Sequence, residues 1–91
     1  MKKLYEYNVE YGRMGTVEGL FVADETIVMA AMGRIAHFGE ILGKHSDISL
    51  ELAIRDMVVK SEDQNFISKL IEIIGSNTIS GYNPLDYMEE E

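Results

Sequence analysis

A stretch near the start of the chain alternates between apolar and polar side chains. Residues 4–11 have a period of two, which predicts a β-strand with its tyrosines on one face and its glutamates on the other. A short glycine-containing segment follows, and residues 16–23 again favour an extended strand. The pattern therefore predicts that the two strands form an antiparallel hairpin.

The length of the turn decides the register of this hairpin. If the turn consists of residues 12–15, Tyr11 pairs with Thr16, and Tyr7 then lies opposite Leu20. This register leaves the apolar end of the hairpin away from its tip. The tyrosine row is typical of a core or a sheet surface, and it would also suit stacking on a nucleotide base.

The next segment is predicted to be a short helix. Asp24 can cap a helix over residues 25–32, and Gly33 can end it. The residues expected to share one face are Ile27, Ala30 and Ala31. Because β-branched side chains are frequent at its start, a strand is the alternative for this segment.

Two or three further strands are predicted after the helix. Residues 34–42 are expected to form a strand with a bulge or close approach at Gly39. Residues 47–54 alternate again, and a turn then leads into a short strand over residues 57–60. The alternating side chains expected to point inward are Ile48, Leu50, Leu52 and Ile54.

The last regular element predicted is an amphipathic helix. Ser61 with Gln64 matches a capping box, and the helix should run to about Ile74 before Gly75 ends it. Its broad apolar stripe is expected to pack on a sheet. The stripe consists of Phe66, Ile67, Leu70, Ile71, Ile73 and Ile74.

The order of these elements, β-β-α-β-β-(β)-α, predicts an α+β fold with a small, mainly antiparallel sheet covered by helices. We expect one domain over residues 1–80, because 91 residues leave no room for a second core. Residues 81–91 are expected to form a C-terminal extension with an acidic tail. Its aromatic and aliphatic side chains could fasten the end of the chain onto the domain.

Composition narrows the classes of function. The net charge is −8, from 16 acidic and eight basic side chains, and no basic stripe is present, so direct nucleic-acid binding is not expected. The absence of cysteine fits a reducing compartment, and no signal peptide or membrane-spanning stretch is visible, so we expect a cytoplasmic protein that does not bind membranes. So short a chain has a marginal core, which favours a homo-oligomer.

The groups most suited to chemistry are concentrated in residues 35–46, which hold both histidines of the chain. The flexible backbone, cation and hydroxyl of residues 43–46 suit an anion, although the full phosphate-loop spacing is missing. Arg13, at the tip of the first hairpin, could add two parallel hydrogen bonds to the anion. The candidate ligand-binding residues are Tyr7, Tyr11, Arg13, His37, Glu40, Lys44, His45 and Ser46.

Metal binding and catalysis are less favoured by the pattern. His37, Glu40 and His45 are metal-ligand types, but ordinary strand and loop histidines explain them as well, so no metal or cofactor is expected. Ser46 follows His45 in sequence, which does not place a base against a hydroxyl. Glu40 has no evident second carboxylate, and we therefore expect no enzyme.

Three segments together resemble small accessory proteins encoded by tailed bacteriophages: residues 11–19, the run Phe38-Gly39-Glu40-x-Leu42-Gly43-Lys44-His45-Ser46, and residues 81–87. The resemblance covers most of the chain and implies action in a bacterial cytoplasm, often by disabling host machinery. Two hypotheses follow. The protein sequesters a small anionic, nucleotide-like ligand, or it is an acidic inhibitor that binds a host protein.

Overall fold

The computed structural model describes residues 1–43 and 47–88 and shows a small α+β fold, as predicted. Its strands are β1 (Lys2–Glu10), β2 (Thr16–Asp24), β3 (Ile35–Gly39), β4 (Ile48–Glu51), β5 (Met57–Ser61) and β6 (Thr78–Gly81). Its α-helices are α1 (Glu25–Ala31) and α2 (Gln64–Ile74). Short 3-10 helices are η1 (Gly12–Met14), η2 (Ile54–Asp56) and η3 (Pro84–Tyr87).

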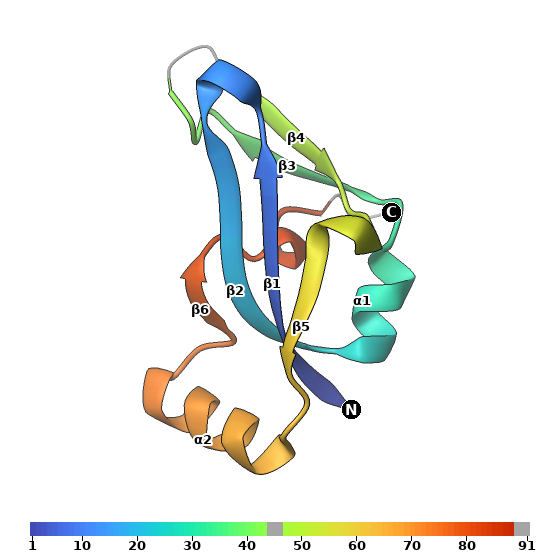
Figure 1. Ribbon diagram of the computed structural model, residues 1–91, viewed down its shortest axis with the longest axis vertical. Helices are drawn as coiled ribbons and strands as arrows, with labels where there is room; N and C mark the ends of the chain where they lie inside the picture. Colours follow the sequence, from blue (N-terminus) through green and yellow to red (C-terminus); the bar gives the residue numbers. More distant parts are fainter. Residues whose placement is uncertain (44–46, 89–91) are drawn as a thin grey trace.

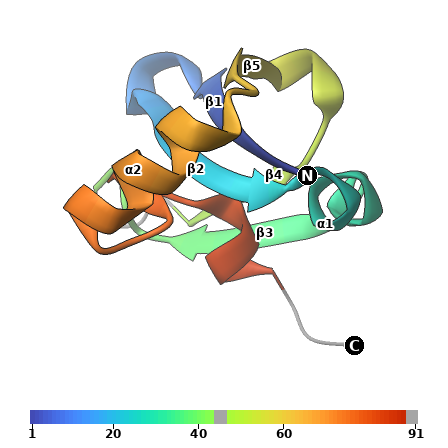
Figure 2. The same ribbon diagram turned by 90° about the horizontal axis from the view of Figure 1, so that it is seen from below.

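The strands form two antiparallel sheets. The larger sheet has the order β5-β1-β2-β6, and β3 pairs with β4 in a separate hairpin. The β3–β4 hairpin crosses one face of the larger sheet, α1 lies on the β5 side, and α2 lies across the end of the sheet opposite η1 (Figures 1 and 2). The two sheets and α1 therefore enclose the main core.

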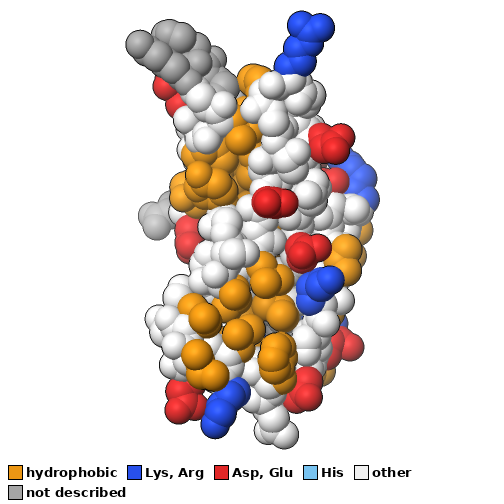
Figure 3. Space-filling view, turned by 60° about the vertical axis from the view of Figure 1, so that its left-hand side comes forward, with side chains coloured by type: hydrophobic (Ala, Val, Ile, Leu, Met, Phe, Trp, Pro, Cys, Tyr) orange, Lys and Arg blue, Asp and Glu red, His pale blue; other side chains and the backbone are white. Residues whose placement is uncertain are grey.

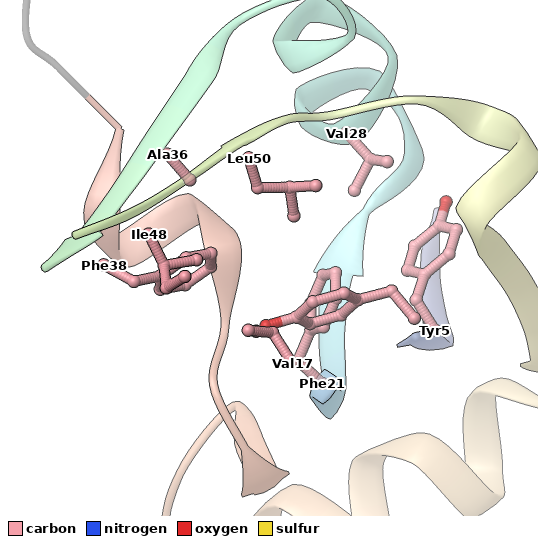
Figure 4. Packing of buried hydrophobic residues seen from close by; sticks show 9 residues of the cluster. Tyr5, Val17, Phe21, Val28, Ala36, Phe38, Ile48 and Leu50 are labelled. Atoms are coloured by element: carbon pink, nitrogen blue, oxygen red, sulfur yellow. The ribbon is translucent and has the colours of Figure 1, made fainter. Parts of the chain in front are cut away.

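The main core is built on the face of the larger sheet that carries the tyrosines. The ring of Phe21 stacks on that of Tyr5 at 5.7 Å between centroids and meets Tyr7 edge-on at 6.1 Å. Buried side chains from α1 and the β3–β4 hairpin close over these rings (Figure 4). They are Val28, Ala36, Phe38, Ile48 and Leu50. The tyrosine row is thus mostly core, the first of the two interpretations given above.

The predicted hairpin is present, but its predicted register is wrong by one residue. The backbone N–H of Tyr11 donates to the carbonyl of Gly15 at 2.8 Å, so Tyr11 lies opposite Gly15 and not opposite Thr16. Glu10 therefore pairs with Thr16, and Tyr7 lies opposite Gly19 instead of Leu20. Because side chains alternate between faces, the one-residue shift moves every β2 residue to a new position across from β1.

Helix α1 is confirmed over the predicted segment, although its buried face differs. The Asp24 carboxylate caps the helix by accepting from the N–H of Thr26 at 2.9 Å. The buried residues are Val28 and Ala31, whereas Ile27 is exposed. Val28 and Ala31 are three apart and lie on one helix face. The predicted face was therefore rotated from the observed one.

The two strands of the smaller sheet are shorter than predicted. The register shift at Gly39 confirms the predicted bulge, but β3 ends there and does not continue to residue 42. β4 ends at Glu51, and Ile54 is exposed in η2 instead of pointing inward. Met57–Ser61 then pairs with β1 as the short last strand that the sequence indicated.

Helix α2 ends at Gly75 as predicted, but it begins at a different cap. The Asp63 carboxylate accepts from the N–H groups of Asn65 and Phe66, while the Ser61 hydroxyl accepts from the N–H of Asp63. The Gln64 amide donates to the carbonyl of Lys2 at 2.6 Å, and so it fastens the helix to β1 and does not complete a capping box.

The apolar stripe of α2 is only partly covered, which corrects the prediction that all of it packs on the sheet. Ile67 is buried against Leu4 and Val22, and Leu70 and Ile71 are half-buried beside them. The remaining members of the stripe, Phe66, Ile73 and Ile74, are exposed. α2 lies at the end of the sheet, so part of its apolar side has no strand beneath it (Figure 1).

The end of the chain adds a strand and a cover that the sequence indicated only in part. β6 was not predicted, and it pairs with β2, so the expected boundary after residue 80 falls inside this strand. Beyond β6, the rings of Tyr82 and Tyr87 contact Phe38 at centroid distances of 5.8 and 4.8 Å. Pro84 is buried as well. The extension therefore packs on the domain, as its apolar side chains indicated.

Two tyrosine hydroxyls of this core are expected to respond in opposite ways to removal. The Tyr7 side chain is 1% exposed, burial raises its pKa, and its hydroxyl has no hydrogen-bond partner among the described residues. Tyr7→Phe should therefore leave stability unchanged or raise it by about 1 kcal/mol. The Tyr11 hydroxyl donates to the carbonyl of Ser49 at 3.1 Å, so Tyr11→Phe should cost about 1 kcal/mol. Urea unfolding measures both, and a large loss from Tyr7→Phe would contradict the expectation.

Candidate functional site

The larger sheet has one face that the β3–β4 hairpin does not cover. Alternation along β1 and β2 places every second residue on this face, opposite to the buried tyrosines and Phe21. α2 covers only one end of it, around Leu4 and Val22. We call the remaining part the open face; its β1 and β2 residues are Glu6, Asn8, Glu10, Thr16, Glu18 and Leu20.

A groove of about 260 Å³ lies in the open face. Gly19 and Gly81 are paired across β2 and β6, so backbone replaces side chains at this point of the sheet. A Cβ atom on Gly81 would collide with the carbonyl oxygen of Glu18, and its φ of +66° also favours glycine. The backbone of the two glycines is part of the groove wall, and the full lining consists of Glu6, Glu18, Gly19, Leu20, Ser80 and Gly81.

The carboxylates beside the groove lie close together. Glu6 is opposite Leu20 and Asn8 is opposite Glu18, so Glu6 and Glu18 are diagonal neighbours, which in antiparallel sheets lie about 7–8 Å apart. Glu10 follows on the same face of β1. The Asn8 amide donates to the Glu18 carboxylate at 3.4 Å, a long hydrogen bond that leaves the charge of Glu18 unchanged.

None of these three carboxylates is neutralised by an ion pair within residues 1–43 and 47–88. The ion pairs found there join the N-terminal amine to Asp24, and Lys3 to Glu25 and Glu62. Hydrogen bonds to Glu25 and Glu62 raise the pKa of Lys3, so this lysine is already occupied by its own chain. The open face therefore presents uncompensated negative charge to solvent.

Apolar side chains adjoin the groove on the α2 side. Leu20, Leu70, Ile71 and Ile79 are half-buried around Leu4, Val22 and Ile67. Figure 3 shows hydrophobic side chains gathered toward the α2 end, with acidic side chains nearer the middle of the same view. The surface thus combines negative charge with an apolar area, which is typical of protein-binding surfaces.

Of the residues proposed from the sequence, the tyrosines are held within the protein. Tyr7 lies in the core, and Tyr11 is half-buried with its hydroxyl bound to the carbonyl of Ser49. Neither ring lies on the surface as a free stacking platform.

The other candidates lie outside the core. Arg13 is exposed in η1, Glu40 is exposed after β3, and His37 lies on the exposed face of β3 with Nδ1 3.1 Å from the Ser49 hydroxyl. A Cβ on Gly15 would lie 3.7 Å from Leu42, so the hairpin tip is beside the segment that precedes residue 44. Lys44, His45 and Ser46 lie outside the described residues. In the part of the chain that is described, no group of three histidine, aspartate or glutamate side chains is placed to hold a metal ion.

The sequence pattern did not point to Glu6, Gly19 or Gly81 as site residues, and the predicted register misplaced Glu18. The predicted register put Glu18 on the face of the tyrosines, whereas the observed register pairs it with Asn8. The signal that could have indicated this surface is the polar side chain at each of residues 6, 8 and 10, because this repeat marks a solvent-facing side of β1.

Comparison of the chain with protein-family models, with curated proteins and with solved structures found no match in any of the three. Among the described residues, no helix has the length and apolar character needed to cross a membrane. The assignment of function therefore depends on the surface of this protein itself.

Proposed function

We propose that the protein is a binding module that holds a basic, partly apolar segment of another protein on its open face. The observation that carries this proposal is the placement of Glu6 and Glu18 in a groove next to half-buried apolar side chains, with Glu10 on the same face and no ion pair to any of the three among the described residues. Lysine or arginine of the partner would pair with the carboxylates, and an apolar side chain would cover Leu20.

The resemblance to phage accessory proteins suggests the biological form of this activity. Such a protein would bind a basic surface of a host protein in the bacterial cytoplasm. It would inhibit the host protein by binding alone, with no reaction and no cofactor. The net charge of −8 would speed the encounter with a basic target. We therefore propose an acidic inhibitor of a host protein and not an enzyme.

The first test replaces Glu6, Glu10 and Glu18 with glutamine. Binding of a synthetic helical peptide of lysine and leucine, measured by calorimetry, should weaken about three- to 150-fold, because each of the three exposed charge pairs contributes about 0.2–1 kcal/mol. The affinity of the unmodified protein should also fall steeply with salt. The triple variant should remain folded, because the replaced side chains are exposed.

The matched control removes the same charge elsewhere, with Glu40, Glu51 and Glu72 replaced by glutamine. This control should lose much less affinity than the open-face variant. Equal losses from both would mean that only net charge matters, and the proposal of a defined acidic site would then be wrong.

A second candidate is the binding of a small anionic, nucleotide-like ligand at the hairpin end. It is favoured by the contact that brings Gly15 beside Leu42, because this contact places Arg13 on the same end as the chain leading to Lys44. Arg13→Ala and Lys44→Ala should each weaken binding of ATP or cyclic di-AMP about ten- to a hundredfold, through lost charge-assisted hydrogen bonds. Calorimetry measures the affinity, and an unchanged melting temperature shows that the fold survives. If neither nucleotide binds the unmodified protein, the hypothesis of a nucleotide-like ligand at the hairpin end is wrong.

A further inference from the structure

The outer edge of β5 is an unprotected strand edge. β5 pairs with β1 on one side, and within residues 1–43 and 47–88 no strand pairs with its other side. Val58 and Val59 are 57% and 44% exposed, and Lys60 is the only charged residue of the strand. Exposed edges with apolar side chains and few charges readily pair with another strand.

An apolar groove of about 260 Å³ lies next to this edge. Met57 and Val59 line it from β5, and Met29 and Met32 line it from α1 and its C-terminal cap. Ile54 is 65% exposed beside them. Uncovered methionine and aliphatic side chains form an adaptable surface for apolar side chains of a partner.

We infer that a second copy of the chain occupies this edge. The two β5 strands pair antiparallel about a two-fold axis at Val58, which extends the larger sheet across the dimer. This register places Met57 opposite Val59 of the second copy, and it brings Asp56, the residue before β5, near Lys60 of the second copy; the symmetry repeats each contact. Apolar side chains thus face apolar ones, and the charges facing each other are of opposite sign.

The observed pairing of β5 with β1 supports this position of the axis. Regular pairing covers Met57–Val59, which is centred on Val58, and the register shift before Ser61 leaves Lys60 as the bulged residue. An axis at Val59 would instead place Val58 opposite Lys60 of the second copy, which opposes an apolar side chain with a charge.

Charge favours this edge over the open face for self-association. Each copy carries a net charge of −8, so two open faces would repel one another. β5 contributes no carboxylate to the contact, and Asp56 just before it meets a lysine. The dimer therefore leaves the open face free for the partner proposed above.

Light scattering and sedimentation of the full chain test the assembly. The unmodified protein should have twice the mass of the 10.3-kDa chain at micromolar concentration. Val58→Glu places two like charges opposite each other and should weaken dimerisation at least about a hundredfold. Ile73→Glu, at a 72% exposed position on α2, is the matched control and should remain dimeric. A monomeric unmodified protein, or a Val58→Glu variant that stays dimeric, would overturn the inference.

Because the chain has no cysteine, a single introduced thiol reports the register directly. Under mild oxidation Val58→Cys should form a disulfide-linked dimer, since the axis places residue 58 opposite itself. Val59→Cys should not, because residue 59 would lie opposite Met57 of the second copy. Linkage of Val59→Cys without Val58→Cys, or of neither, would overturn the proposed pairing.

Discussion

Replacing Gly19 with alanine is expected to destabilise the protein by about 3 kcal/mol, one of the largest effects of any single methyl group in this chain. A Cβ at this position would lie 2.7 Å from Cε1 of Tyr7 and still closer to the carbonyl oxygen of Tyr82. Tyr7 is fully enclosed, and the Tyr82 carbonyl belongs to the backbone, so neither can move away cheaply. Chemical unfolding with urea or guanidinium measures the loss.

The control for this prediction is Gly12→Ala in η1. Gly12 has a φ of +62° but no heavy atom within 4 Å of the added Cβ, so alanine should cost only about 1–2 kcal/mol through backbone strain. A Gly19→Ala variant as stable as the unmodified protein would show that β6 and Tyr82 do not approach β2 as closely as described. The backbone of β2 and β6 that lines the groove of the open face would then also be placed differently.

Local signals of the sequence predicted most of the elements but not their exact pairing. The alternation in residues 4–11, the cap at Asp24 and the stop at Gly75 each depend on neighbours in the chain, and all three are confirmed. The hairpin register depends on whether Tyr11 lies opposite Gly15 or opposite Thr16. A single hydrogen bond from Tyr11 to Gly15 decides this, and alternation alone cannot distinguish the two cases.

Long-range contacts account for the features that the sequence did not indicate. Residues 78–81 have no clean alternation, and they form β6 because the edge of β2 offers backbone groups for pairing. The Gln64 amide matched a capping box, but the carbonyl of Lys2, far away in sequence, takes its hydrogen bond. The broad stripe of α2 predicted burial, yet the sheet ends before it can cover Ile73.

The candidate site was harder to predict than the fold for the same reason. The open face depends on the correct register, since only this register places Glu18 opposite Asn8 and beside Glu6. The reactive side chains of residues 35–46 predicted a site in that segment instead. Exposed carboxylates on an ordinary strand carry no motif, and their arrangement as a surface appears only when the strands are paired.

Ending the chain at Gly81 is expected to prevent folding altogether. This truncation removes the rings of Tyr82 and Tyr87, which contact Phe38, and it removes the buried Pro84. It also removes Met88, which forms a backbone bridge to Ala36. Burial of one large apolar side chain contributes about 1.5–3 kcal/mol, and a small domain has only about 5–15 kcal/mol of stability in total. The loss of several such side chains should therefore exceed what this protein can tolerate.

Circular dichroism and thermal unfolding of two truncated chains measure this effect. The chain that ends at Met88 keeps every contact described above and should unfold in one cooperative transition. The chain that ends at Gly81 should show no cooperative transition, because Phe38 and the β3–β4 hairpin lose their cover on the C-terminal side. A cooperative transition in the shorter chain, at a similar temperature, would show that residues 1–81 form a domain by themselves and that the segment after β6 is not needed for folding. Ser80 and Gly81 of β6 line the groove of the open face, so a truncated chain that does not fold should also lose the proposed binding of a basic partner.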